Sequence, residues 1–344
     1  MNTILALDLG SHSVKTALFS LENRKTTSPE LLGAGKSKTH EGAMKNGLIK
    51  NLNSVISATE SAIATAENSA SKKLKKSISA SKTILSFSNQ TVKENLSSAS
   101  YTRDDPSSPI SASEIEDILK AVQEKATAAA KTLIALETNN PSIEMKLLSS
   151  AIVDLKIDGV AVSEPLGLPG KNLNLKVYTT LAPLLQISAL EKLCDSLNLD
   201  LLAIIPEPFA LARAALKTDS NFSGIILNIG AEKTNLAILE NGVLAGTNIF
   251  PIGLKTASET PDAWLSALKI TLNDLGLPNL PEKIYLTGGG ASSEKLQETL
   301  ALSNWFRTLD FTTRPTLDLL DFYLKTPPEI SPLLSGLLEI SLDF

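Results

Sequence analysis

The sequence contains few of the residues on which thiol and metal chemistry depends. Its 344 residues include one cysteine, Cys194, and two histidines, His12 and His40. One cysteine cannot form a disulfide within the chain, and the apolar periodicity around Cys194 favours a buried helical position over a reactive thiol. Neither histidine has a partner at metal-ligand spacing, so zinc binding and histidine-based acid–base catalysis are poorly supported.

Basic charge and long apolar runs are also lacking. The chain has 32 lysines and arginines against 37 acidic residues, a formal charge of −5, whereas proteins that bind nucleic acid normally carry a basic surplus. No apolar run approaches the ~20 residues that a membrane helix needs, and the N-terminal segment lacks the features of a signal peptide. We therefore expect a cytoplasmic protein that binds no nucleic acid and has no transmembrane segment.

A repeated motif organises what is present. The segment LDLGSHSVKTALF (7–19) aligns without a gap with LNIGAEKTNLAIL (227–239), at a constant offset of 220 residues that sets Asp8 against Asn228. Each copy reads as an apolar strand, a glycine turn able to adopt φ > 0 and a second alternating strand, which predicts a β-hairpin. After the second copy, Asn241-Gly242 predicts a tight turn into a third strand. The repeat predicts two similar α/β lobes.

The residues between the two copies add helices and a candidate insertion. Apolar residues recur at helical spacing in 51–71, and a second long helix is predicted to begin at a capping box formed by Ser111 and Glu114. Strands are predicted on both sides of this second helix, which indicates an inserted α+β subdomain. The predicted boundaries are 1–81 for the first part of the first lobe, 82–160 for the insertion, 161–217 for the remainder of the first lobe and 218–344 for the second lobe.

The first hairpin turn is a candidate phosphate-binding segment. Backbone N–H groups, hydroxyl groups and a cation are the donors that bind phosphate, and the turn offers all three. The residues are Gly10, Ser11, His12, Ser13 and Lys15. Asp8, at the end of the first strand, is placed to hold Mg²⁺ through water, and an aspartate that caps the turn is the alternative.

A second glycine-rich segment follows a predicted strand near the end of the chain. In LTGGGASSEKL (286–296), Gly288, Gly289 and Gly290 would let a planar ligand approach the backbone closely. On its own this segment is weak evidence, and its order after the two hairpins gives it weight.

In this order, the hairpins and the glycine turn resemble the bacterial actin-like ATPases. The resemblance extends over nearly the whole chain and is strongest to the FtsA family of cell-division proteins and the related PilM family of type IV pilus assembly. It is carried by LALDLGSHSVKTALFS, GAGKSKTHEGAMKNGLIKNLNSVISATESAIATAE, SFSNQTVKENLSS, ISASEIEDILKAV, GIILNIGAEKTNLAILENGVLAGTNIFPIG and IYLTGGGA, while IPEPFALARAAL is as similar to PilM as to FtsA.

The resemblance implies a fold and a set of ligands. The fold is the α/β actin-like ATPase fold, with two ribonuclease-H-like lobes and an inserted α+β subdomain of SHS2 type. The ligands are ATP and Mg²⁺, and the implied contacts in the second hairpin are Gly230, Lys233 and Thr234. The short segment between 253 and 283 predicts a reduced outer subdomain in the second lobe.

The second hairpin departs from the family pattern. Asn228, Ala231 and Glu232 stand where the family usually has an aspartate and a glycine-rich turn. An amide cannot act as a base, and a carboxylate ~4 Å from a phosphate costs about 4 kcal/mol at an effective dielectric constant near 20. Glu207 orients the attacking water in some relatives, and an acidic residue that favours a helix N-terminus is the alternative. We therefore expect binding of ATP and Mg²⁺ to be weak or lost, without efficient ATPase activity.

Three functions follow from the resemblance. The first is a scaffold that binds the tubulin-like ring protein FtsZ or other division proteins, which the segment KTHEGAMKNGLIKN favours. The second is a PilM-like cytosolic adaptor for the short tail of an inner-membrane pilus protein, favoured because no basic amphipathic helix follows SGLLEISLDF. The third is an active ATPase or small-molecule kinase. Recruitment to the inner face of the membrane through partners, and self-association, are expectations left open.

Overall fold

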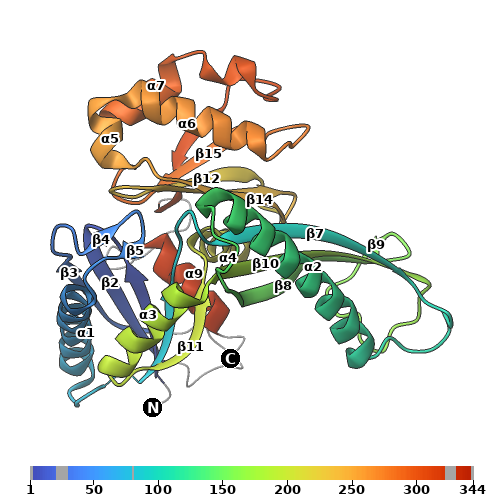
Figure 1. Ribbon diagram of the computed structural model, residues 1–344, viewed down its shortest axis with the longest axis horizontal. Helices are drawn as coiled ribbons and strands as arrows, with labels where there is room; N and C mark the ends of the chain where they lie inside the picture. Colours follow the sequence, from blue (N-terminus) through green and yellow to red (C-terminus); the bar gives the residue numbers. More distant parts are fainter. Residues whose placement is uncertain (1–2, 21–29, 80, 322–330, 342–344) are drawn as a thin grey trace. The chain divides into compact units, whose positions relative to one another are not determined.

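The chain folds into two compact units, which Figure 1 shows in a computed structural model that describes residues 3–20, 30–79, 81–321 and 331–341. Unit 1 comprises Met1–Gln90 and Ser188–Phe344, and unit 2 comprises Thr91–Ile187. Unit 1 contains two five-stranded sheets, and unit 2 contains a four-stranded sheet. Two sheets in unit 1 agree with the two lobes that the repeat predicts.

The first sheet of unit 1 is built around the first hairpin. Its strand order is β11-β6-β1-β2-β3, with β1, β2 and β3 antiparallel and with β6 parallel to both β1 and β11. Helix α1 packs so closely on β3 that a Cβ atom at Gly35 would lie 2.0 Å from the Ala62 carbonyl oxygen. The elements are β1 (Thr3–Leu9), β2 (Ser13–Ser20), β3 (Glu30–Lys38), α1 (Leu52–Leu74), β6 (Lys82–Ser86) and β11 (Asp200–Ile205).

The second sheet of unit 1 repeats this topology. Its order is β14-β13-β12-β15-β16, so a hairpin again has a third antiparallel strand on one side and two parallel strands on the other. Asn241 and Gly242 have φ angles of 49° and 80°, which confirms the predicted tight turn into β14. The strands are β12 (Gly224–Ile229), β13 (Thr234–Glu240), β14 (Val243–Phe250), β15 (Lys283–Thr287) and β16 (Thr316–Leu319).

Helices bury one face of the second sheet. Trp264 is fully buried in this core, where its ring centroid lies 6.1 Å from that of Phe250. The segment between β14 and β15, for which we predict a reduced outer subdomain, folds as α5 and α6. The elements are α5 (Leu254–Glu259), α6 (Pro261–Asp274), α7 (Glu294–Leu302) and the 3₁₀ helix η1 (Trp305–Thr308).

Two helices of unit 1 pack directly on each other, and the contact depends on a glycine. A Cβ atom at Gly336 of α9 would lie 1.8 Å from the Ala210 carbonyl oxygen of α4. Helix α9 also contacts β1 and β6. These elements are α4 (Glu207–Thr218) and α9 (Pro332–Ser341), and the remaining elements of this part of the chain are β4 (Met44–Lys45), β5 (Leu48–Ile49) and α3 (Leu184–Ser196).

Unit 2 is one antiparallel sheet covered by a long helix. The strand order is β7-β10-β8-β9, and apolar residues of α2 and of β8 and β10 form the core. The Ser111 hydroxyl caps α2 by accepting a hydrogen bond from the Glu114 N–H, whereas the Glu114 carboxylate pairs with Arg103 at 2.8 Å. The capping box is therefore half formed. The elements are β7 (Lys93–Thr102), α2 (Ala112–Thr138), β8 (Met145–Ile157), β9 (Val160–Ala161) and β10 (Asn172–Pro183).

The compact insertion occupies different residues from the predicted 82–160. Strand β6, at 82–86, pairs in parallel with β1 and so belongs to the first sheet of unit 1. Strand β10, at 172–183, lies between β7 and β8 and so belongs to unit 2. Neither assignment is visible in local sequence, because a strand's partners are set by pairing over long distances along the chain.

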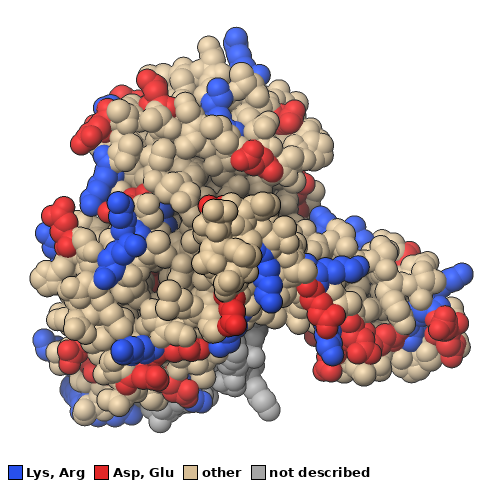
Figure 2. Space-filling view, in the orientation of Figure 1, with Lys and Arg blue, Asp and Glu red and all other residues tan. Residues whose placement is uncertain are grey.

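The structure also shows the burial of the cysteine and the distribution of charged side chains. Cys194 of α3 is buried, as predicted. Within the described ranges, no helix is both long enough and apolar enough to cross a membrane. On the face of the molecule seen in Figure 2, basic and acidic side chains are interspersed over the surface.

Candidate functional site

The two hairpins of unit 1 have the same turn. Asp8 faces Lys15 across β1 and β2, and Asn228 faces Asn235 across β12 and β13. The Gly10 N–H donates to the Ser13 carbonyl at 3.2 Å, and the matching bond in the second turn is 2.9 Å long. The repeated segment therefore folds twice into one local structure.

Glycine is needed in the first turn for a different reason from the one predicted. Gly10 is not among the residues with positive φ, so the expected left-handed conformation is wrong. A Cβ atom there would lie 2.7 Å from the Ser13 carbonyl oxygen, a distance that no side chain tolerates. Because its N–H closes the turn, Gly10 does not offer this group to a phosphate, which corrects a second expectation.

A cavity of about 740 Å³ lies between the two hairpin turns of unit 1. Its volume is within the range of small-molecule sites, about 300–1,000 Å³. Most of the predicted site residues line it: Asp8, Gly10, Ser11, His12, Ser13, Lys15, Glu207, Gly230, Lys233, Gly288 and Gly289. It is also lined by Lys36, Leu254, Lys255 and Ser258, which the sequence did not single out.

Two predicted site residues do not line this cavity. The Thr234 hydroxyl donates to the Ile252 carbonyl at 2.8 Å and accepts from the indole N–H of Trp264 at 2.9 Å, so it supports the core. Gly290 packs on Ile229, where a Cβ atom would meet the side chain at 2.3 Å. Both residues hold the second hairpin in place and are not cavity-lining residues.

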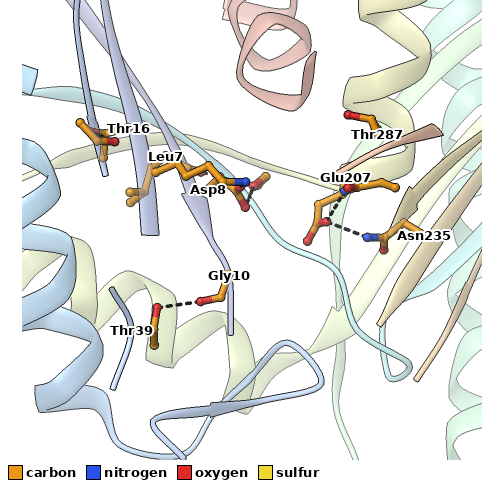
Figure 3. A network of polar contacts seen from close by, with 12 residues as sticks. Leu7, Asp8, Gly10, Thr16, Thr39, Glu207, Asn235 and Thr287 are labelled. Atoms are coloured by element: carbon orange, nitrogen blue, oxygen red, sulfur yellow. Dashed lines mark hydrogen bonds and ion pairs between the residues drawn. The ribbon is translucent and has the colours of Figure 1, made fainter. Parts of the chain in front are cut away.

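The first hairpin carries an internal ion pair. Lys15 Nζ lies 3.2 Å from Asp8 Oδ2, and the Asp8 side chain is 6% exposed. The neighbouring Asp8 carboxylate raises the pKa of Lys15, against the opposing effect of burial. Figure 3 shows the turn that follows, where the Thr39 hydroxyl donates to the Gly10 carbonyl at 2.8 Å. Asp8 is therefore already balanced by a cation of its own hairpin.

Glu207 lies at the first residue of α4, directly after Pro206, and its carboxylate is buried among donors. Oε2 accepts from the amide nitrogen of Asn228 at 3.1 Å and from that of Asn235 at 2.7 Å, the second of which Figure 3 shows. Oε1 accepts from Lys233. Burial raises the pKa of Glu207, and the opposing attraction of Lys233 does not fully offset it.

Ser88 joins this network to the first lobe. Its hydroxyl accepts from the Glu207 N–H at 2.9 Å, and its carbonyl accepts from Lys233 Nζ at 2.5 Å. The two amides therefore have a physical role in the second hairpin. They donate to Glu207, where an aspartate at either position would repel it.

Glu232 lies in the turn of the second hairpin and lines the cavity. It accepts a hydrogen bond of 2.9 Å from the Asn46 N–H and another from the Ser11 side chain. It also forms an ion pair with Lys255, whose Nζ lies 3.1 Å from Glu232 Oε1. Partial burial acts to raise its pKa, but the three donors outweigh burial and lower it. The carboxylate of Glu232 therefore stands between the two turns.

The donors for a metal ion are few. Among the residues that the structure describes, no group of three or more histidine, cysteine or acidic side chains is arranged to hold a metal. The cavity contributes three carboxylates: Asp8, which pairs with Lys15, Glu207, whose two oxygens already accept hydrogen bonds, and Glu232, which accepts from Asn46 and pairs with Lys255. Asp8 lines the cavity, as the predicted contact with Mg²⁺ through water requires, but its carboxylate is paired with Lys15.

Comparison with known proteins agrees with this architecture. No protein-family model matches the chain. A solved structure, the PilM–PilN type IV pilus biogenesis complex, superposes with a TM-score of 0.64 over 98% of this chain and 98% of that one, at 16% identity. The chain has the actin-like ATPase fold.

In sequence, the chain is similar to cell-division proteins. The chain is 25% identical over 276 residues to the cell division protein FtsA of Pseudomonas aeruginosa, an alignment that covers 78% of the chain. It is 27% identical over 112 residues, or 32% of the chain, to FtsA of Neisseria meningitidis serogroup B. The chain spans 60% of the length of the first relative and 27% of the second.

Proposed function

We propose that this actin-fold chain is a protein-binding adaptor with weak or lost ATP binding, whose partner is an FtsZ-like tubulin homologue or another division protein. The observation that carries the proposal is the set of hydrogen bonds that the Glu207 carboxylate accepts. Its two carboxylate oxygens accept hydrogen bonds from Lys233, Asn228 and Asn235. An ionised carboxylate has about four lone-pair sites, and these three donors occupy three of them, which leaves about one site, on Oε1, for the water or hydroxyl that a general base must contact. Glu207 is therefore held in a structural network and is poorly placed to act as a general base.

The cavity residues also fit a magnesium triphosphate poorly. Proteins of this fold generally bind nucleotide with Mg²⁺. Here Glu232 takes three donors between the two turns, and a terminal phosphate placed there would meet its carboxylate. Two negative charges in contact repel each other strongly where solvent is partly excluded. Both features support a protein whose role is to bind and position other proteins, in the cytoplasm or at the membrane through its partners.

A second candidate is a PilM-like adaptor that binds the short tail of an inner-membrane protein. The observation that favours it is the structural similarity from end to end, at 98% coverage of both chains. By contrast, the FtsA relatives are longer than the part that the chain matches. The sequence similarity points to FtsA and the extent of the fold points to PilM, so the partner has to be identified by binding.

Isothermal titration calorimetry with ATP and Mg²⁺ tests the nucleotide part of the proposal. We expect no binding tighter than about 1 mM, which corresponds to a binding free energy of about −4 kcal/mol. A dissociation constant in the micromolar range, together with phosphate release on incubation, would instead support the third function, an active ATPase.

Two peptides test the partner. An FtsZ C-terminal peptide and an N-terminal peptide of a pilus inner-membrane protein are immobilised in parallel, each beside a scrambled version of the same composition. Capture of the purified chain by the FtsZ peptide supports the division adaptor, and capture by the pilus peptide supports the second candidate. If neither native peptide captures more than its scrambled control, both partner assignments fail.

A further inference from the structure

The turn of the second hairpin contacts the first lobe through two successive residues. Glu232 accepts from Asn46 and Ser11, and Lys233 donates to Ser88. The partners come from segments 186, 221 and 145 residues away along the chain, and all of them precede the second sheet. The turn of the second lobe is therefore tied to the first lobe by side chains and backbone groups of the protein itself.

The donors around Glu232 are those that bind phosphate elsewhere. They are a backbone N–H in a tight turn, a serine hydroxyl and a lysine ammonium group. Asn46 has φ of 49° and Gly47 has φ of 81°, so the two residues form the central pair of a tight turn between β4 and β5. A Cβ atom at Gly47 would lie 2.3 Å from the Ser88 carbonyl oxygen, and this close packing holds the Asn46 N–H in position.

We propose that Glu232 is a tethered anion that occupies the place of a bound polyphosphate between the two turns, and that it holds the lobes together while excluding a terminal phosphate. We call Glu232 with Asn46, Ser11 and Lys255 the Glu232 bridge. This inference rests on the proposed loss of ATP binding and gives that loss a cause. It also predicts that the association of the two turns requires no nucleotide.

The alternative is that Glu232 and Lys255 form an ordinary surface ion pair, which neither holds the lobes together nor excludes a phosphate. Exposed ion pairs contribute little to stability, because water and salt screen them. The Glu232 side chain is 18% exposed, whereas Lys255 is 59% exposed, so the carboxylate is held mainly by the first-lobe donors and the lysine lies at the rim. The two alternatives therefore predict different results when the carboxylate is removed. The Asn46 N–H loses its protection from exchange if Glu232 is a bridge, and keeps it if Glu232 only forms an ion pair at the rim.

The test combines amide hydrogen exchange with binding of inorganic pyrophosphate, on the nucleotide-free full chain. The variants are Glu232→Ala and the nearly isosteric Glu232→Gln. The control is Glu259→Ala, which removes the same charge from an exposed position at the end of α5. We expect Glu232→Ala to exchange the Asn46 amide at least about tenfold faster and to bind pyrophosphate at least about tenfold more tightly than the wild type, with the control unchanged. Glu232→Gln keeps an acceptor for the amide, so it should show the gain in pyrophosphate binding with a smaller change in exchange.

The inference is overturned if Glu232→Ala or, should that variant be unfolded, Glu232→Gln binds pyrophosphate no more tightly than the wild type. It is equally overturned if the Asn46 amide of a folded Glu232→Ala variant exchanges as slowly as that of the control. These outcomes are differences between variants. The proposed function, in contrast, fails on the affinity of the wild type for ATP, so the two failures are distinguishable.

Discussion

Asn235 Nδ2 lies 2.7 Å from Glu207 Oε2, at the hairpin position that Lys15 occupies in the first copy of the repeat. In the first hairpin the facing pair is an ion pair, and in the second it is two amides that both donate to a carboxylate from α4. The loss of charge in the second copy therefore accompanies the gain of an outside partner. The duplicated frame is the same, and the chemistry at its centre has changed.

Lys233 should be the side chain on which this network depends most. Replacing it with Met leaves Glu207 buried without its cation, which typically costs about 3–5 kcal/mol in the free energy of unfolding. Chemical denaturation at pH 7 measures the loss. The matched control is Lys255→Met, at a lysine that is 59% exposed and should cost less than about 1 kcal/mol. Equal effects of the two substitutions would contradict this account.

Protonation should remove the contribution of Glu232 to stability. Glu232 has a pKa below its ordinary value of 4.5 because its three donors outweigh partial burial. A carboxylate whose pKa is lower in the folded state contributes stability above the unfolded pKa, and this contribution is lost as the pH falls through the folded pKa. The difference in unfolding free energy between the wild type and Glu232→Gln should therefore be present at neutral pH. It should be lost as the pH falls through the pKa that Glu232 has in the folded protein, which is lower than 4.5. A difference that stays constant over this range would show that the charge of Glu232 is not involved.

The contact between Gly336 and Ala210 should tolerate no side chain. Gly336→Ala would place a methyl group 1.8 Å from the Ala210 carbonyl, so α9 has to move away from α4. Overpacking of this kind costs about 1–3 kcal/mol, which thermal denaturation resolves as a drop of several degrees in Tm. The control is Gly289→Ala, because no atom lies within 4 Å of a Cβ there. The prediction fails if both variants melt together.

Cys194 should be unreactive in the folded protein. Burial raises the pKa of its thiol to about 12, with a smaller contribution from Asp195, so the thiolate is scarce near neutral pH. A thiol reagent at about pH 8 should label the chain only after denaturation. Rapid labelling of the native protein would contradict the buried position of this residue in α3.

The hairpins, the start of α2 and part of the cavity lining could be predicted from sequence, because each depends on residues close together in the chain. The hairpins follow from alternation of apolar residues around a glycine turn, and α2 begins directly after Ser111 because the Ser111 hydroxyl caps the helix by accepting from the Glu114 N–H. The lining of the cavity by Asp8 and Lys15 also follows from the repeat, since these residues face each other at the end of a hairpin.

The remaining features depend on contacts between distant segments. Lys36, Lys255 and Ser258 line the cavity without any motif that would identify them. One donor to Glu232 is a backbone N–H 186 residues away, and a backbone group leaves no trace in a sequence. Thr234 was assigned to the ligand by its position in the motif, whereas its hydroxyl bonds Trp264 in the core. A motif fixes the backbone more reliably than it fixes where each side chain points.

The two amides of the second hairpin restrict which side chains this site can accept. Asn228 donates to Glu207 at 3.1 Å, so an aspartate at that one position would set two carboxylates against each other in a buried place. An acidic residue at position 228 therefore requires a second change at Glu207, and the single substitution Asn228→Asp is expected to destabilise the protein.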